Sequence, residues 1–139
     1  MTKLKIYIAS AIKYKNDVEV LVAWLQTNFD VEITRDWWTN YKTEASKMED
    51  LSDHQYYASP INRAIDQLDV MAIEEATIFI ILGKDLNGAL IELGVALTLN
   101  KLCLSFGQHN RTAMRTRSIL VDDYIQLKNI INLAIYGGG

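Results

Sequence analysis

A single carboxylate interrupts an otherwise apolar helical segment in the second half of the chain. The segment "NGALIELGVALTLN" covers residues 87–100, and apolar side chains fall on all sides of its helical wheel around Glu92. The residues three and four positions away are all small or apolar: Gly88, Ala89, Val95 and Ala96. No cation on this helix can therefore pair with Glu92, and an unpaired carboxylate taken out of water costs several kcal/mol. We expect Glu92 to be partly buried and to open into a cleft.

A second carboxylate, Asp69, lies 23 residues before Glu92, at the border of the apolar stripe of another predicted helix. Two carboxylates in one cleft suit glycosidic chemistry, in which one attacks the anomeric carbon and the other holds or protonates a group. Periodicity cannot show that the two converge. The alternatives stay open that Glu92 faces solvent on a narrow polar seam and that Asp69 is an ordinary surface residue.

Short β-branched apolar runs alternate with helical periods, which is typical of a parallel α/β sheet. The predicted strands are 4–10, 31–38, 77–83, 101–107 and 118–123. The predicted helices are 16–29, 59–76, 88–100 and a last one that ends near Tyr136. Asn16 is expected to cap the first helix, whose apolar face is formed by Val18, Leu21, Val22 and Leu25. The second is expected to bury Ile61, Ile65, Leu68, Ala72 and Ala76.

This order places Glu92 at the ligand-binding edge of the sheet, because ligands of open parallel sheets bind beyond the carboxyl ends of the strands. The turn before it contains Gly83 and Gly88, which let backbone amides approach a ligand, although turns need glycine in any case. Trp37 and Trp38 end the second strand at the same edge, where one can stack on a base or simply pack in the core. Residues 38–58 form a long polar segment, either a lid or a disordered loop.

The composition bounds the remaining possibilities. A chain of 139 residues with 50% hydrophobic residues and a net charge of −3 predicts one globular domain, residues 1–136, followed by a disordered glycine tail, residues 137–139. The chain offers no basic field for nucleic acid and no apolar run long enough for a membrane span or a signal peptide, so we expect a cytoplasmic protein. Cys103 is expected to be a buried thiol. His54 and His109 lack ligand spacing, so neither a metal nor another cofactor is predicted.

Three stretches resemble the nucleoside 2-deoxyribosyltransferase family, including its nucleotide N-hydrolase branch. They are "KIYIAS", "INRAIDQLDVMAIEEATIFIIL" and "GALIELGVALTLNK", and the likeness covers most of the chain. The resemblance implies a single-domain α/β sandwich of the flavodoxin or Rossmann-like kind, with a five-stranded parallel sheet flanked by helices. It also implies a homodimer or higher homo-oligomer with sites shared across the interface, acting on the N-glycosidic bond of a small nucleoside or nucleotide.

The resemblance assigns roles to residues of this chain. Glu92 matches the nucleophile that attacks C1′, Asp69 the acid that assists proton handling, and Tyr7 the hydroxyl that holds the nucleophile. The substrate-binding positions that it implies are Ala9, Ser10, Trp37, Gly88, Ala89 and Thr112, the last donated by a neighbouring subunit.

The chain departs from the family pattern in two places. The first loop, "ASAIKYK", lacks a glycine that several members carry, and the turn before Glu92 lacks the serines of the nucleotide hydrolase branch. Lys13, Lys15 and Arg111 are alternative phosphate ligands or ordinary solvated charges. Transfer of the sugar to a base or to water stays open, as do an inactive nucleotide-binding or nucleotide-sugar-binding module and a purely interacting domain whose helix 88–100 packs at an interface.

Overall fold

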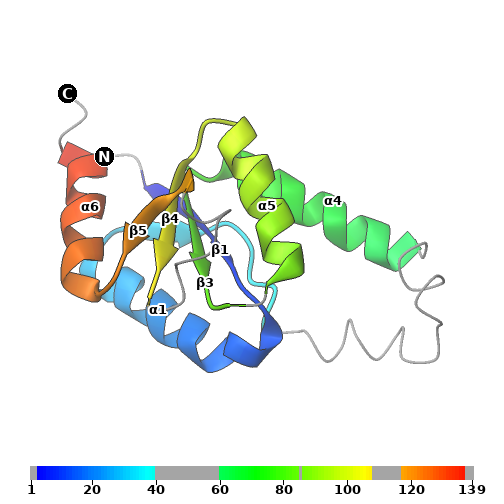
Figure 1. Ribbon diagram of the computed structural model, residues 1–139, viewed down its shortest axis with the longest axis horizontal. Coiled ribbons are helices and arrows are strands. Elements are labelled where there is room, and N and C mark those ends of the chain that lie inside the picture. Colours follow the sequence, from blue (N-terminus) through cyan, green and yellow to red (C-terminus); the bar gives the residue numbers. More distant parts are fainter. Residues whose placement is uncertain (1–2, 40–59, 85, 108–116, 137–139) are drawn as a thin grey trace.

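The described part of the chain forms a parallel α/β sandwich (Figure 1). The computed structural model describes residues 3–39, 60–84, 86–107 and 117–136. Within them lies a five-stranded parallel sheet of order β2-β1-β3-β4-β5. The strands are β1 (Leu4–Ala9), β2 (Val31–Ile33), β3 (Ile78–Leu82), β4 (Leu102–Phe106) and β5 (Ile119–Val121). The predicted fold class and the presence of five strands are confirmed, although β2 is shorter than predicted.

Helices cover both faces of the sheet. After a short 3₁₀ turn (Ile12–Tyr14) come α1 (Lys15–Asn28), α4 (Pro60–Glu75), α5 (Asn87–Thr98) and α6 (Tyr124–Tyr136). Helices α1 and α6 pack on one face, and α4 and α5 pack on the other (Figure 1). Each described helix therefore buries one apolar side against the sheet, which is the arrangement that a parallel sheet requires.

The two faces hold two separate clusters of buried side chains, because neighbouring strand residues point to opposite sides. In β1, Ile6 and Ile8 join the cluster under α1 and α6, whereas Tyr7 and Ala9 join the cluster under α4 and α5. Strand β3 is buried along its whole length, as its continuous apolar sequence predicts. The register of β1 thus directs the Tyr7 side chain towards the helices that carry Asp69 and Glu92.

The second strand is shorter than predicted. It was expected to span residues 31–38, but β2 ends at Ile33. The last strand-like contact is made by the Thr34 N–H, which donates to the Ile6 carbonyl at 2.9 Å. The next carbonyl on that side of β1, at Ile8, instead accepts a hydrogen bond from the Trp37 indole Nε1 at 2.7 Å. A side chain therefore replaces the main-chain partner, and the prediction of a long strand was wrong.

Several helix details also differ from the expectations. Helix α1 has Tyr14 at its N-cap position without a side-chain cap, so the predicted Asn16 cap was wrong. In α4, Leu68 is 47% exposed while Ile73, which was not predicted, is fully buried. Helix α5 buries Ala89, Leu93 and Ala96 but leaves Ile91 73% exposed, so this helix is buried on one side only. A helix that packs on a sheet buries only those of its apolar side chains that face the sheet.

The direction in which successive strands are added to the sheet reverses between β1 and β3. It leaves β1 towards β2 on one side and continues from β3 towards β4 on the other, so the loops after β1 and β3 part at their carboxyl ends. Gly83 follows β3 with φ +104°, a conformation that favours glycine, and lies against the Tyr14 ring. The Tyr14 hydroxyl accepts a hydrogen bond from the Lys84 N–H at 3.1 Å, which joins the two loops.

We predict that Gly83→Ala destabilises the protein by about 1–3 kcal/mol, because a Cβ would force a strained φ and lie 2.5 Å from Tyr14 Cε2. The matched control is Gly94→Ala, at a position on α5 where a Cβ meets nothing within 4 Å. That change is expected to stabilise the protein by up to about 1 kcal/mol through helix propensity. Urea unfolding of both variants measures the difference, and equal effects would contradict this account of Gly83.

Candidate active site

A hydrogen bond between β1 and α5 lies at the centre of the candidate site. The Tyr7 ring is 1% exposed and stacks on Phe79, with centroids 5.7 Å apart and planes 10° from parallel. Its hydroxyl donates to Glu92 Oε2. Glu92 is half-buried in the second turn of α5. The expected partial burial of this carboxylate is therefore present in the structure, and a rigid aromatic residue holds it.

Asp69 and Arg35 form an ion pair next to this hydrogen bond. Arg35 follows β2, and its Nε donates to Asp69 Oδ1 of α4 at 2.5 Å. The two side chains are only 15% and 21% exposed, respectively. The Asp69 charge acts on both Tyr7 and Glu92. The Tyr7–Glu92 hydrogen bond and the Arg35–Asp69 ion pair thus join four segments that are distant in the sequence, and the Asp69 charge is near enough to act on Glu92.

The surroundings of Glu92 shift its proton affinity. Burial is the largest cause and raises the pKa of Glu92 to about 7, and the negative charges of Asp69 and Asp66 act in the same direction. The hydrogen bond from Tyr7 and the positive charge of Arg35 lower this pKa. Glu92 therefore changes charge near neutral pH. Burial, followed by the charges of Glu92 and Asp69, raises the pKa of Tyr7 well above its ordinary value, so its hydroxyl stays a donor.

The other residues suggested by the sequence have varied surroundings. Ser10 Oγ donates to the Leu82 carbonyl at 2.6 Å and so ties the end of β1 to the end of β3. Ala9 and Ala89 are 0% and 3% exposed and lie in the cluster of buried side chains under α4 and α5. Gly88 lies in open space, as a close approach to a ligand requires. Trp37 is half-buried at the same edge of the sheet.

Some predicted elements lie outside the described residues. These are Thr112, Arg111, both histidines, all of the segment 38–58 beyond Thr39, and the glycine tail. Lys13 and Lys15 are described: the Lys13 ammonium lies over the Tyr14 ring at 5.3 Å, and Lys15 pairs loosely with Glu19. Both of these contacts stay within the loop after β1 and the start of α1.

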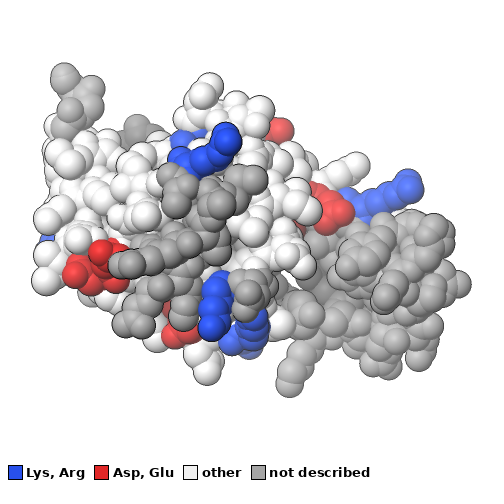
Figure 2. Space-filling model, in the orientation of Figure 1, with Lys and Arg blue, Asp and Glu red and all other residues white. Residues whose placement is uncertain are grey.

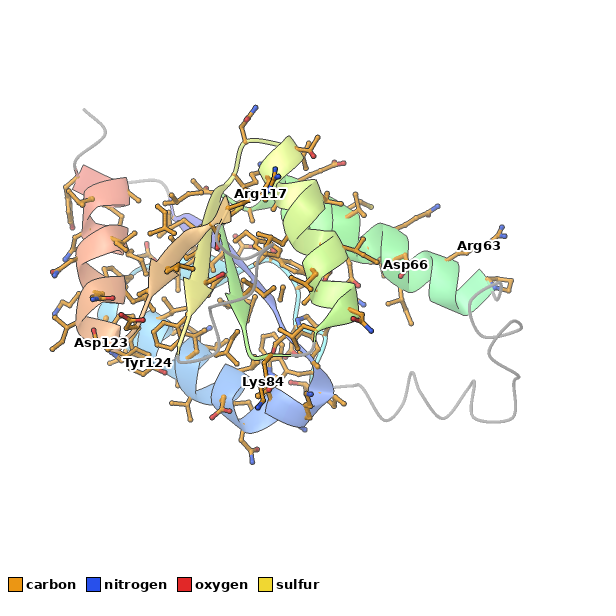
Figure 3. All side chains as sticks on the ribbon, viewed as in Figure 1. Arg63, Asp66, Lys84, Arg117, Asp123 and Tyr124 are labelled. Carbon is orange, nitrogen blue, oxygen red and sulfur yellow. The ribbon has the colours of Figure 1, made fainter. Side chains whose placement is uncertain are left out.

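Sequence reasoning missed Arg35 and Asp66. A signal for Arg35 was available, since "VEITRD" puts an arginine directly after a strand, at the edge where ligands of parallel sheets bind. Asp66 lies three residues before Asp69, a spacing that puts both on one side of a helix. Figure 3 shows Asp66 on α4, one turn from Arg63.

Surface features locate no competing site of similar chemistry among the described residues. One hollow lies between α1 and β2 over Trp38, and another lies at the amino edge of the sheet beside α6. Neither hollow is lined by Asp69 or Glu92, so the candidate site is defined by the contacts of these two residues with Arg35 and Tyr7. Within the described ranges, no three His, Cys, Asp or Glu side chains lie close enough to hold a metal ion. Cys103 is free and buried, as expected, and burial raises the pKa of its thiol to about 11.

Charged residues on the described surface form small clusters separated by uncharged areas. The view in Figure 2 contains no broad basic area on this surface. None of the described helices combines the length and the apolar character that a membrane crossing needs.

Comparison with known proteins supports the fold. No protein-family model matches the chain, and no curated protein sequence matches it. Among solved structures, the 2-deoxyribosyltransferase from the psychrotolerant bacterium Bacillus psychrosaccharolyticus is similar with a TM-score of 0.60 and 20% identity, over 90% of each chain. The CMP N-glycosidase BcmB of Clostridium botulinum has a TM-score of 0.50 and 19% identity, over 95% of this chain and 99% of that one. The chain thus has the α/β fold shared by these two enzymes.

Glu92→Gln is expected to change stability in a pH-dependent way. The folded-state pKa of Glu92 is raised from 4.5 to about 7. The stability that protonated Glu92 contributes to the folded state is therefore fully present at low pH and is lost as pH rises through 7. The glutamine keeps an acceptor for Tyr7 and does not ionise. The variant should therefore match the parent near pH 4 and exceed it by up to about 3 kcal/mol above pH 8, measured by urea unfolding. Exposed Glu75→Gln serves as the control for charge, and a pH-independent difference for Glu92→Gln would contradict the prediction.

Proposed function

We propose that this protein is an enzyme that breaks the N-glycosidic bond of a (deoxy)nucleoside or its 5′-monophosphate. The observation that carries the proposal is the half-buried Glu92 carboxylate, which Tyr7 holds beside the Arg35–Asp69 ion pair at the carboxyl edge of the sheet. Such a carboxylate is fixed, desolvated and next to a second carboxylate, which suits a nucleophile in glycosidic chemistry.

In the proposed first step, a Glu92 oxygen forms a bond to C1′ while the bond from C1′ to the base nitrogen breaks. The electron pair leaves with the base, which takes up a proton from solvent water, and the nucleophile of the second step returns a proton to solvent. In the second step, water or another base attacks C1′ and releases Glu92, so the configuration at C1′ is retained. Tyr7 donates to Glu92 and orients it. Asp69, charged through its contact with Arg35, serves as an acceptor for a hydroxyl or amino group of the substrate.

Two further observations support the proposal. The solved structures with this fold include a 2-deoxyribosyltransferase and a CMP N-glycosidase, and both names describe reactions at an N-glycosidic bond. The motif resemblance assigns the nucleophile to Glu92, the residue that the structure surrounds with Tyr7, Asp69 and Arg35. Gly88 and Trp37 are proposed to contact the sugar and the base. The segment 38–58 is proposed to control water access and hence the choice between transfer and hydrolysis.

We predict that a panel of nucleosides and 5′-monophosphates, offered with and without a second free base, contains a substrate whose base the protein releases. Chromatography follows release and exchange of the base. Glu92→Gln is expected to lower kcat/KM by at least about 1,000-fold, because the amide cannot act as the nucleophile. Mass spectrometry of acid-quenched turnover should show one sugar attached to the peptide that contains Glu92.

Glu75→Gln, on the exposed side of α4, is the control and should cleave like the parent. The rival function is a nucleotide- or nucleotide-sugar-binding module without turnover. Binding of a nucleotide by calorimetry with no base release from any compound would favour the rival, and parental activity of Glu92→Gln would refute the assigned nucleophile.

We also propose a homodimer that packs through the outer surfaces of α4 and α5. Met71 of α4 and Ile91 of α5, on two helices that contact each other, are 55% and 73% exposed and offer apolar surface for such an interface. The proposed dimer brings Thr112 of a neighbouring subunit to the site, as the motif resemblance implies. Sedimentation velocity should show a dimer for the parent and a monomer for Ile91→Asp, and a monomeric parent at micromolar concentration would contradict the proposal.

A further inference from the structure

The backbone around Arg35 is fixed although it lies outside any strand. The Thr34 N–H donates to the Ile6 carbonyl at 2.9 Å, and the Trp37 indole donates to the Ile8 carbonyl at 2.7 Å. Asp36 accepts hydrogen bonds from the Thr39 N–H and hydroxyl at 3.0 and 2.7 Å. Contacts to β1 from residues before and after Arg35 in the sequence therefore fix the position of the Arg35 backbone. A functional group held in this way is preorganised.

The Arg35 side chain spans two layers of the fold. It leaves the segment after β2 and reaches Asp69 on α4, with 2.5 Å between Nε and Oδ1. Because both side chains are mostly buried, this pair is not an exposed surface ion pair of negligible strength. A charge-assisted hydrogen bond from a planar guanidinium restricts both the position and the rotation of the carboxylate.

Among the described residues, polar and charged groups from three segments act on Glu92. Tyr7 comes from β1, Asp66 and Asp69 come from α4, and Arg35 comes from the segment after β2. Two neighbouring carboxylates disfavour each other's ionised form, and a cation paired with one of them relieves this repulsion. Glu92 needs to be ionised to attack a sugar, and Asp69 accepts hydrogen bonds on both of its oxygens only when it is ionised.

We propose that Arg35 is a positioning residue for the reaction at Glu92, because its ion pair fixes and neutralises Asp69 and so lets Asp69 and Glu92 be carboxylates at the same time. Arg35 does not touch the reacting atoms in this role. The inference rests on the proposed function for what Glu92 does, but its electrostatic part is measurable without a substrate.

The first test is a carboxyl ¹³C NMR titration of Glu92, assigned by the signal that Glu92→Gln removes. Arg35→Gln is expected to raise the titration midpoint by about one pH unit, because the neighbouring positive charge is lost. Arg35→Lys should keep most of the charge effect and move the midpoint much less. Arg117→Gln is the matched control for net charge. Arg117 precedes β5 at the amino edge of the sheet, whereas Lys84 and the candidate site lie at the carboxyl edge (Figure 3).

A double variant tests whether Arg35 acts through Asp69. Arg35→Gln combined with Asp69→Asn removes both charges, so the midpoint should return towards that of the parent. If the double variant keeps the full shift of Arg35→Gln, then Arg35 acts on Glu92 directly and the positioning role is refuted. Circular dichroism checks that each variant folds, and Arg35→Met, which keeps the aliphatic stem, replaces Arg35→Gln if that protein does not fold.

The second test is the pH dependence of kcat/KM on whichever compound the parent cleaves. With a midpoint near 7 in the parent, a shift of one unit lowers the ionised fraction of Glu92 roughly fivefold at pH 7, and the loss should recover above pH 9. A purely structural role would lower kcat/KM by one factor at every pH. A midpoint in Arg35→Gln within about 0.2 pH unit of the parent overturns the inference even if nucleosides are cleaved. A shifted midpoint without any cleavage refutes the proposed function instead.

Discussion

The hydrogen bond from Tyr7 to Glu92 is the interaction on which the arrangement of the site depends. Glu92 needs to leave bulk water to be held in place, yet a carboxylate resists that transfer. Tyr7 offsets part of the cost with a donor whose ring cannot move, since it stacks on Phe79 within the core. Burial and this donor act in opposite directions on the proton affinity of Glu92. The result is a group that is buried enough to be fixed and still able to ionise near neutral pH.

The topology explains how this hydrogen bond comes to have charged neighbours. The inner strand β1 contributes Tyr7, and the helix after β3 contributes Glu92. The segment after β2 contributes Arg35, and the helix before β3 contributes Asp69. Because all five described strands are parallel and the chain reverses its direction of travel between β1 and β3, these segments meet at one edge. Arg35 lies on the segment after its strand and Asp69 and Glu92 lie on helices, whereas Tyr7 is part of the sheet core itself.

Sequence alone predicted the features that depend on local pattern. The alternation of apolar runs gave five strands in the right places, and the wheel around Glu92 indicated a partly buried carboxylate. Sequence could not predict features that depend on partners far along the chain. The Arg35–Asp69 pair joins residues 34 positions apart, and the end of β2 depends on an indole that reaches Ile8. The burial of Ile73 rather than Leu68 depends on which part of α4 lies over the sheet, and no helical wheel contains that information.

The early end of β2 also leaves only a short edge strand on that side of the sheet. Strand edges with unpaired main-chain groups invite other chains to extend a sheet, and short edge strands are one way that proteins avoid this. Here both outer strands, β2 and β5, have three residues, while the inner strands have five or six. The Trp37 indole occupies the Ile8 carbonyl just beyond β2. The Trp37 side chain thus occupies a main-chain acceptor of β1 that would otherwise be open to a further strand beside the short edge strand β2.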